Sequence, residues 1–98
     1  FLALLVEHYT RERSVAFYAN QLCITPKYLG TICREISSKL ATDIIASAVI
    51  MDAKAKLHSS DLTVQEISNS LNFPNASFFG RYFKRHTGFS PLQYRESY

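Results

Sequence analysis

Apolar residues recur along this 98-residue chain at intervals of three and four positions, and no stretch alternates between apolar and polar for long. This spacing puts apolar side chains on one face of an α-helix, so the pattern predicts an all-α fold. About seven helices are expected, over residues 1–11, 15–22, 26–36, 42–58, 64–71 and 76–86, with a short last helix that begins near residue 91.

The same spacing decides which side chains each helix is expected to bury, because residues three and four apart lie on one face. In the sixth segment Phe79 and Phe83 stand four apart and should face the core. The other expected inward positions are Leu2, Leu5, Val6 and Tyr9; Val15, Tyr18, Ala19 and Leu22; Leu29, Ile32, Cys33 and Ile36; Ile44, Ile45, Ala48, Val49, Met51, Ala55 and Leu57; and, as scaffold, Phe73, Tyr82 and Tyr94.

Capping residues mark several expected helix ends. Thr25 followed by Pro26 supplies a hydroxyl N-cap and then a proline where the missing N–H does no harm. Thr63-Val-Gln-Glu66 and Ser90-Pro-Leu-Gln93 have the spacing of capping boxes. Two further expected N-caps are Ser14 and Asn75, and Gly88 is suited to a left-handed C-cap.

The chain repeats itself at an offset of 49 and then 50 residues. Ser14-Val15 aligns with Thr63-Val64, and Leu29–Arg34 aligns with Phe79–Lys84 after one extra residue in the second turn. Each copy reads as a short helix, a turn of three or four residues and a longer helix with a basic residue after its buried pair. This arrangement is typical of a helix-turn-helix.

The two copies define the expected organisation: a first helix-turn-helix subdomain over residues 1–41, a linker helix over 42–59 and a second subdomain over 60–98. The small residues Ala19 and Ser68 occupy aligned positions, where the two helices of each copy must approach closely. A linker of about 16 helical residues spans about 24 Å, and successive major-groove faces on one side of B-DNA lie about 34 Å apart. The linker and its flanking turns could therefore hold both second helices in adjacent grooves.

The distribution of charge points to a partner. The formal net charge is only +3, but no Asp or Glu lies between Glu66 and Glu96. That window interleaves basic with aromatic residues: Arg81, Lys84, Arg85 and Arg95 with Phe78, Phe79, Tyr82 and Phe83. A short helix that buries an aromatic face and presents unopposed positive charge on the other is typical of a DNA-binding element.

Composition excludes other classes of function. Apolar residues at 47% and charged residues at 19% are typical of a globular chain. No nucleophile–histidine arrangement, metal-ligand spacing or glycine-rich phosphate loop occurs, and His8, His58 and His86 are scattered, so no enzyme, metal or cofactor is expected. Cys23 and Cys33 are expected to be buried and reduced, with a disulfide as the less favoured alternative.

The reduced cysteines suit a cytoplasmic protein. The opening segment FLALLV is too short to span a membrane and follows no basic leader, so neither a membrane helix nor a signal peptide is expected. Because the chain starts at Phe1 and not at Met, we expect it to be part of a longer protein.

Two stretches resemble a known family. LTVQEISNSLNFPNASFFGRYFKRHTGFSPLQYR, residues 62–95, and SVAFYANQLCITPKYLGTICREI, in the first half, resemble the DNA-binding domain of the AraC/XylS transcription regulators. The resemblance implies seven helices, two helix-turn-helix motifs joined by a linker helix, and sequence-specific binding to double-stranded promoter DNA. It also implies an N-terminal sensor or dimerisation domain and RNA polymerase as partners in the full-length protein, with this fragment monomeric.

Three positions depart from the usual family pattern. Asn72 stands where glycine is usual, although asparagine also tolerates a left-handed turn. Val49 occupies a linker-helix position where a basic residue is usual, so any contact from that position is in doubt. Ser38 replaces a frequent glycine, so an altered end of the first recognition helix is expected.

The outward faces of the third and sixth helices supply the candidate contacts to DNA. The base-reading candidates are Lys27, Gly30, Thr31, Ala76, Ser77, Gly80 and Arg81, and the phosphate candidates are Thr25, Arg34, Asn75, Lys84, Arg85 and His86. Arg81 is favoured for base reading because a guanidinium pairs bidentately with guanine; a phosphate contact or a surface ion pair is the alternative. Gly80 either lets its helix sit deep in the groove or is a neutral exposed position. Tyr28 either stacks on DNA or packs.

A helical protein-interaction module with a basic face is the alternative function. Such a module would show a contiguous exposed apolar groove, whereas the phenylalanines of this chain fall on inward positions. DNA binding would weaken steeply with salt and would differ between sequences, so a duplex titration separates the two hypotheses.

Overall fold

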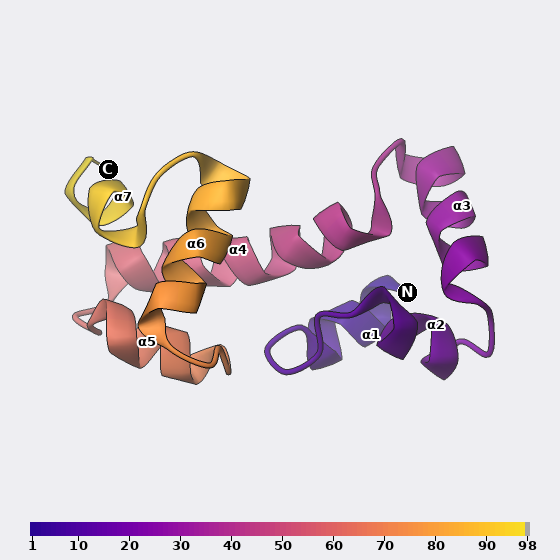
Figure 1. The fold of residues 1–98 in the computed structure, drawn as a ribbon, viewed down its shortest axis with the longest axis horizontal. Coiled ribbons are helices and arrows are strands. Elements are labelled where there is room, and N and C mark those ends of the chain that lie inside the picture. The colour runs from indigo at the N-terminus through magenta and orange to yellow at the C-terminus, as the bar shows by residue number, and fades with distance from the viewer. Residues whose placement is uncertain (98) are drawn as a thin grey trace. The chain divides into compact units, whose positions relative to one another are not determined.

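A computed structural model describes residues 1–97, which form seven α-helices and contain no β-strand (Figure 1). The helices are α1 (Leu2–His8), α2 (Val15–Gln21), α3 (Pro26–Ser37), α4 (Ala41–Ser59), α5 (Val64–Ser70), α6 (Ala76–Thr87) and α7 (Pro91–Ser97). The prediction of an all-α fold of about seven helices is confirmed within these residues.

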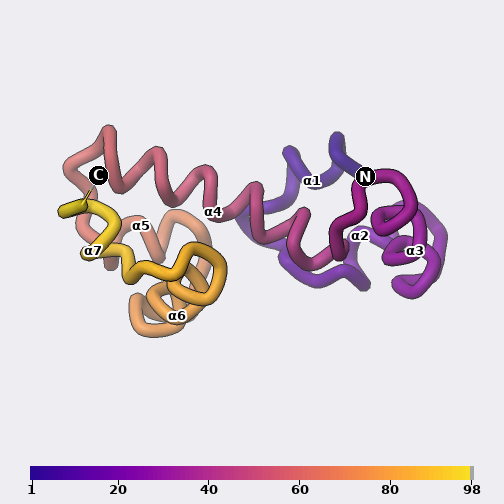
Figure 2. Tube along the Cα trace, turned by 90° about the horizontal axis from the view of Figure 1, so that it is seen from above, coloured from indigo at the N-terminus to yellow at the C-terminus, as the bar shows by residue number. Residues whose placement is uncertain are grey.

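The chain folds as two compact units, unit 1 (Phe1–Ala48) and unit 2 (from Val49 onward), and α4 contributes residues to both. In unit 1, α2 packs against α3; in unit 2, α6 packs against α5 and α7. The tube in Figure 2 follows the short turns that join α2 to α3 and α5 to α6. Each unit therefore contains one helix-turn-helix.

Each unit has its own buried core. The core of unit 1 is formed by Leu5, Tyr18, Ala19, Leu29, Cys33, Ala41 and Ile45. The buried side chains of unit 2 include Val49, Ile50, Ala53, Leu57, Ile67, Ser68, Leu71, Phe73, Phe79 and Phe83. Unit 2 thus buries three phenylalanine rings in and around its recognition helix, whereas unit 1 uses smaller side chains at the matching places.

Several predicted inward positions are wrong. Leu2 and Val6 are 67% and 74% exposed, because α1 turns Leu5 inward and packs Leu4 and Phe1 beside it. In α4 the exposed residues include Met51 and Ala55, because the buried stripe runs through Ala46, Ile50 and Ala53 instead; in α3, Ile36 is 82% exposed on the last turn. Helices α1 and α4 are apolar over most of their circumference, so the spacing alone does not select one face.

The predicted caps are confirmed. Thr63 N–H donates to Glu66 Oε1 (2.9 Å) and Glu66 N–H donates to Thr63 Oγ1 (3.1 Å), which completes the capping box of α5. The box that starts α7 is likewise formed, with Ser90 N–H donating to Gln93 Oε1 (2.9 Å) and Gln93 N–H to Ser90 Oγ (3.1 Å). These reciprocal bonds satisfy backbone donors that a helix start otherwise leaves without partners.

The recognition helices α3 and α6 end in the same way. Gly88 has a φ of 84° and donates its N–H to Lys84 O (2.8 Å), as a left-handed cap does. Ser38 has a φ of 61° and donates its N–H to Arg34 O (3.0 Å). The expected alteration of the first recognition helix at Ser38 is therefore wrong, since serine adopts the conformation that glycine normally supplies.

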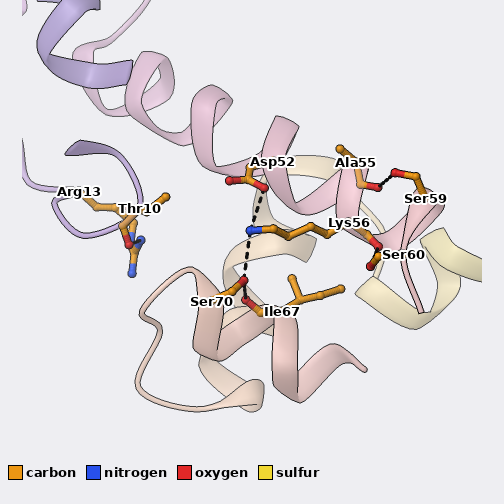
Figure 3. A network of polar contacts seen from close by, with 9 residues as sticks. All are labelled: Thr10, Arg13, Asp52, Ala55, Lys56, Ser59, Ser60, Ile67 and Ser70. Atoms are coloured by element: carbon orange, nitrogen blue, oxygen red, sulfur yellow. Dashed lines mark hydrogen bonds and ion pairs between the residues drawn. The ribbon is translucent and has the colours of Figure 1, made fainter. Parts of the chain in front are cut away.

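Helix α1 ends earlier than predicted because the chain turns at Tyr9. Glu12 N–H donates to His8 O (2.8 Å), and the Arg13 guanidinium donates to Tyr9 O and Thr10 O, both at 3.4 Å. A cation that donates to carbonyls at a helix C-terminus also opposes the helix dipole. This local arrangement of Thr10 and Arg13 is drawn in Figure 3.

A polar network joins α4 to α5 in unit 2 (Figure 3). Lys56 Nζ lies 3.1 Å from Asp52 Oδ1 and donates to Ser70 Oγ (3.2 Å), while Ser70 Oγ donates to Ile67 O (2.8 Å). Lys56 therefore has its charge opposed within the unit, so its ammonium is directed to the scaffold and not to a partner.

Candidate nucleic-acid interface

The turn of each helix-turn-helix is built by the same backbone bonds. In unit 1, Cys23 N–H donates to Asn20 O (3.1 Å) and Ile24 N–H to Ala19 O (3.0 Å). In unit 2, Asn72 N–H donates to Asn69 O and Phe73 N–H to Ser68 O, both at 3.1 Å. The donors and acceptors of the two turns are 49 residues apart throughout, as the repeat predicts.

Both turns pass through a left-handed residue. Asn72 has a φ of 60°, which confirms that asparagine adopts this turn, and Cys23 has a φ of 59°. The small residues that precede these turns, Ala19 and Ser68, are both fully buried, as the close approach of the helices requires. Cys23 is exposed and Cys33 is buried, and both are free thiols, so the expectation that both are buried is wrong for Cys23.

A side-chain cap then starts each recognition helix. Tyr28 N–H donates to Thr25 Oγ1 (3.1 Å) at the start of α3, and Phe78 N–H donates to Asn75 Oδ1 (2.8 Å) at the start of α6. Asn75 uses its side-chain carbonyl oxygen for the cap, which leaves its NH₂ group available as a hydrogen-bond donor. Thr25 and Asn75 are both exposed, where a phosphate could approach the helix N-terminus.

Buried residues four apart hold each recognition helix on its unit. Phe79 and Phe83 of α6 are fully buried, with ring centroids 6.0 Å apart, and Phe73 packs 5.1 Å from Phe79. In α3 the matching anchors are Leu29 and Cys33. The predicted inward faces of these helices are therefore confirmed at these positions, and the opposite faces are free to meet a partner.

The structure leaves most of the predicted DNA-contact residues exposed. Thr25, Lys27, Thr31 and Arg34 of unit 1 and Asn75, Ser77, Arg81, Lys84, Arg85 and His86 of unit 2 are exposed, and Gly30, Ala76 and Gly80 are half-buried. The two groups belong to separate units, so each forms its own candidate surface. We call them the α3 face and the α6 face.

On the α6 face, Arg81 is held against an aromatic ring. Its Cζ lies 5.9 Å from the centroid of the Phe78 ring, and Phe78 is 44% exposed. Arg81 and Arg85 line a hollow of about 320 Å³ together with Phe78 and Tyr82, and the Tyr82 ring lies 4.8 Å from His86. Sequence reasoning gave Phe78 no site role, although its position three residues before Arg81 is a signal that a cation–π pair could form.

On the α3 face, Thr31 is the residue that matches Arg81, and its hydroxyl already forms a hydrogen bond within its own helix. Thr31 aligns with Arg81 and its Oγ1 donates to Lys27 O (3.0 Å), so the hydroxyl offers only acceptor sites to a partner. Tyr28, which aligns with Phe78, is 56% exposed, so of its two alternatives the structure does not support packing.

Arg95 does not contribute to either face. Its Nε donates to Leu57 O (2.9 Å), and its terminal nitrogen lies 3.5 Å from Lys56 O and Ser60 O. The guanidinium thus caps the C-terminus of α4 and stabilises the negative end of that helix. The basic window seen in the sequence therefore supplies Arg81, Lys84 and Arg85 to the surface and Arg95 to the scaffold.

The positive charge of α6 is unopposed within its unit. Across residues 1–97, no carboxylate is found in an ion pair with Arg81, Lys84 or Arg85, whereas Lys56 is paired with Asp52. Nor do these residues contain a helix long and apolar enough to cross a membrane, or a cluster of three or more His, Cys, Asp or Glu that could hold a metal.

The sequence matches known proteins over nearly its whole length. A family model described as a helix-turn-helix domain covers residues 18–97. The raffinose operon transcriptional regulatory protein RafR of Pediococcus pentosaceus is 27% identical over 96 residues, which are 98% of this chain and 35% of RafR. The chain thus spans about a third of the length of that relative.

Solved structures share the fold. The C-terminal domain of AraT, a response regulator from Geobacillus stearothermophilus, has a TM-score of 0.88 at 22% identity, over 98% of this chain and 80% of that chain. The DNA-binding domain of AdpA, a global transcriptional factor solved in complex with a target DNA, has a TM-score of 0.83 at 22% identity, over 99% of this chain and 87% of that chain. At these identities the likeness establishes the fold.

Two helix-turn-helix units, each with an exposed and mainly basic recognition helix, define a domain of the DNA-binding class. The chain belongs to the helix-turn-helix family matched over residues 18–97, and the resemblance to the AraC/XylS regulators is confirmed. This is a family of DNA-binding domains of transcription regulators.

Proposed function

We propose that this chain binds double-stranded promoter DNA in a sequence-specific manner, with α3 and α6 each lying in a major groove and the two grooves adjacent. The observation that carries the proposal is the α6 face: Arg81, Lys84 and Arg85 stand unopposed on the side of α6 opposite its buried anchors. Membership of the family supports it, as does the shared fold with the AdpA domain that was solved with a target DNA.

The proposed roles follow from the chemistry of the side chains. Arg81 is assigned to a base edge, because its guanidinium can donate two parallel hydrogen bonds to guanine and is supported by Phe78. The other proposed base-facing residues are Lys27, Gly30, Thr31, Ala76, Ser77 and Gly80; those assigned to phosphates are Thr25, Arg34, Asn75, Lys84, Arg85 and His86. Phosphate contacts set the register of the helix, and base contacts carry the sequence preference.

One observation favours the alternative function of protein binding. Unit 1 has an apolar hollow of about 530 Å³ lined by residues of α1, α3 and α4, with the exposed Leu2 and Ile36 at its rim. On α3 the lining includes Ile32, Cys33 and Ile36, which lie opposite Lys27 and Thr31 around the helix. A protein bound at this hollow would leave the α3 face open, so the two functions do not exclude each other.

We further infer that this chain forms part of a longer protein. RafR is about three times as long as the matched segment, which supports a further N-terminal sensor or dimerisation domain in the full-length protein. We also infer that RNA polymerase is a partner of that protein, that this chain alone is monomeric, and that it has no catalytic role. The family and RafR, a transcriptional regulatory protein, support these inferences.

The proposal can be tested by selecting bound duplexes from a random pool. The selected duplex and a scrambled duplex are then each titrated with the protein at increasing salt concentration. A protein that neutralises six to ten phosphates loses about 10³–10⁵ in affinity between about 50 and 200 mM salt. We expect a steep loss and a preference for the selected duplex. Weak binding that is indifferent to salt and sequence would contradict the proposal and would favour the protein-binding alternative.

A further inference from the structure

Two of the three glycines of the chain have no evident role in its fold. Gly88 ends α6 in a left-handed conformation, which explains that glycine. Gly30 and Gly80 lie inside α3 and α6, and neither has a positive φ. Among the described residues, a β-carbon on Gly30 would meet no atom within 4 Å, and one on Gly80 would meet Pro91 Cδ at 4.0 Å, an ordinary van der Waals contact. Alanine would therefore fit at both positions.

Glycine inside a helix destabilises it relative to alanine, because glycine loses more backbone freedom on folding. Neither glycine gains a compensating close approach from its own unit. The two are also 50 residues apart, so they occupy the same position of the repeat. Both helices are therefore destabilised by a glycine that no contact within the chain explains. A contact with a bound partner would explain both.

Each glycine lies at the half-buried edge of its outward face. On an α-helix the residues three and four positions away lie beside a given residue. Beside Gly30 these include the exposed Lys27 and Arg34 and the buried Cys33. Beside Gly80 they include the exposed Ser77 and Lys84 and the buried Phe83. Each face therefore has a strip of helix backbone without a side chain, between a buried anchor and the side chains assigned to DNA.

We propose that at Gly30 and Gly80 the backbone of α3 and of α6 passes close to the wall of the major groove. The missing side chain lets each helix enter the groove deeply, so that the neighbouring exposed side chains reach the bases and phosphates. This inference rests on the proposed function. It makes the two glycines determinants of affinity through shape, whereas their neighbours act through hydrogen bonds and charge.

The test compares the variants Gly30→Ala and Gly80→Ala with the unchanged chain. The thermal unfolding midpoint and the affinity for the selected duplex are measured separately for each. We expect each alanine to raise the unfolding midpoint by about 4 °C. We expect the same change to weaken duplex binding about tenfold or more, as a mismatched contact does. Gly80→Leu should weaken binding further than Gly80→Ala, since the steric conflict grows with side-chain size.

Asn20→Ala and Asn69→Ala are matched controls, because these exposed residues occupy aligned positions in α2 and α5, outside both faces. They should leave duplex affinity unchanged. Unchanged or tighter duplex binding by the glycine variants would overturn the inference, as would a lowered unfolding midpoint, since alanine would then not fit. Absence of salt-dependent duplex binding by the unchanged chain would instead overturn the proposed function together with this inference.

Discussion

Units 1 and 2 have the same backbone plan and different side chains on both sides of the recognition helix. Helix α6 buries two phenylalanines and exposes Arg81, Lys84, Arg85 and His86. Helix α3 buries Leu29 and Cys33 and exposes Lys27, Thr31 and Arg34. The α6 face therefore has the greater positive charge on the larger apolar anchor, so we expect unit 2 to supply most of the affinity and unit 1 to adjust it.

The residues with positive φ also differ between the units, and the difference favours the stability of unit 2. Unit 2 has Asn72 and Gly88 there, the two residue types that tolerate positive φ best, whereas unit 1 has Cys23 and Ser38. Each residue with a β-carbon in this conformation costs about 1–2 kcal/mol, less for asparagine. Unit 1 is thus expected to be the less stable unit, although the hydrogen bonds of its turns match those of unit 2.

The largest expected effect is the loss of an aromatic anchor. Phe83→Ala should destabilise unit 2 by about 3–5 kcal/mol, because it removes a fully buried ring and leaves a cavity. The equivalent change in unit 1, Cys33→Ala, should cost only about 1 kcal/mol, because it removes a single sulfur atom.

Amide NMR spectra of the two variants, recorded against temperature, would measure this contrast for each unit. In Phe83→Ala the signals of α5 and α6 should lose their native shifts first, while those of α2 and α3 persist. Simultaneous loss of both sets would contradict the independence of the two cores. Equal midpoints for the two variants would contradict the difference in their anchors.

The next largest expected effect is on the affinity and base preference of DNA binding. Arg81→Ala should cost about 1–3 kcal/mol on the selected duplex and relax the preference at one base pair. Thr31→Ala should cost less, because the threonine hydroxyl already donates to Lys27 O. Arg81→Lys is the informative control: it keeps the charge but loses the bidentate geometry, so base preference should still relax. Competition binding with single-position duplex variants provides the measurement. Equal losses on selected and random DNA would show that Arg81 contacts only the backbone.

A smaller effect is expected at the ends of the recognition helices. Ser38→Gly should stabilise unit 1 by about 0.5–1 kcal/mol, because glycine adopts a φ of 61° without a steric penalty. The reverse change, Gly88→Ser, should destabilise unit 2 by a similar amount. Chemical denaturation followed by unit-specific amide signals would check both. A loss of stability in Ser38→Gly would mean that the serine side chain contributes more than its backbone strain costs.

The turns, caps and recognition helices could be predicted from the sequence because the bonds that form them are local. Thr63 reaches Glu66, Asn75 reaches Phe78 and Gly88 reaches Lys84, all within four residues. Such bonds depend on residue type and spacing, both of which the sequence shows directly. The repeat added a second, independent sign of the same turns.

Other features depend on contacts that spacing does not encode. Arg95 bonds to carbonyls 35 to 39 residues away, so its scaffold role could not be separated from that of the other basic residues in its window. Apolar residues occur on most sides of α1 and α4, so their inward faces depend on how each helix rotates against its neighbours, and Leu2, Val6 and Met51 were misassigned for that reason. The roles of the α3 and α6 faces toward bases and phosphates stay predictions, because they concern DNA.

The smallest expected effect is a dependence of stability on pH that unit 2 has and unit 1 lacks. The backbone and side chain of Thr63 donate to the Glu66 carboxylate and hold the pKa of Glu66 below its ordinary value. Because the folded-state pKa lies below that of the unfolded chain, this stabilisation is present above the ordinary pKa of 4.5 and is lost as the pH falls through the lowered value. Helix α2 has Phe17 at the matching position, so unit 1 lacks this dependence. Glu66→Gln should keep the cap and remove the dependence from unit 2. A carbon-detected titration in which the Glu66 carboxyl titrates at or above 4.5 would contradict this account.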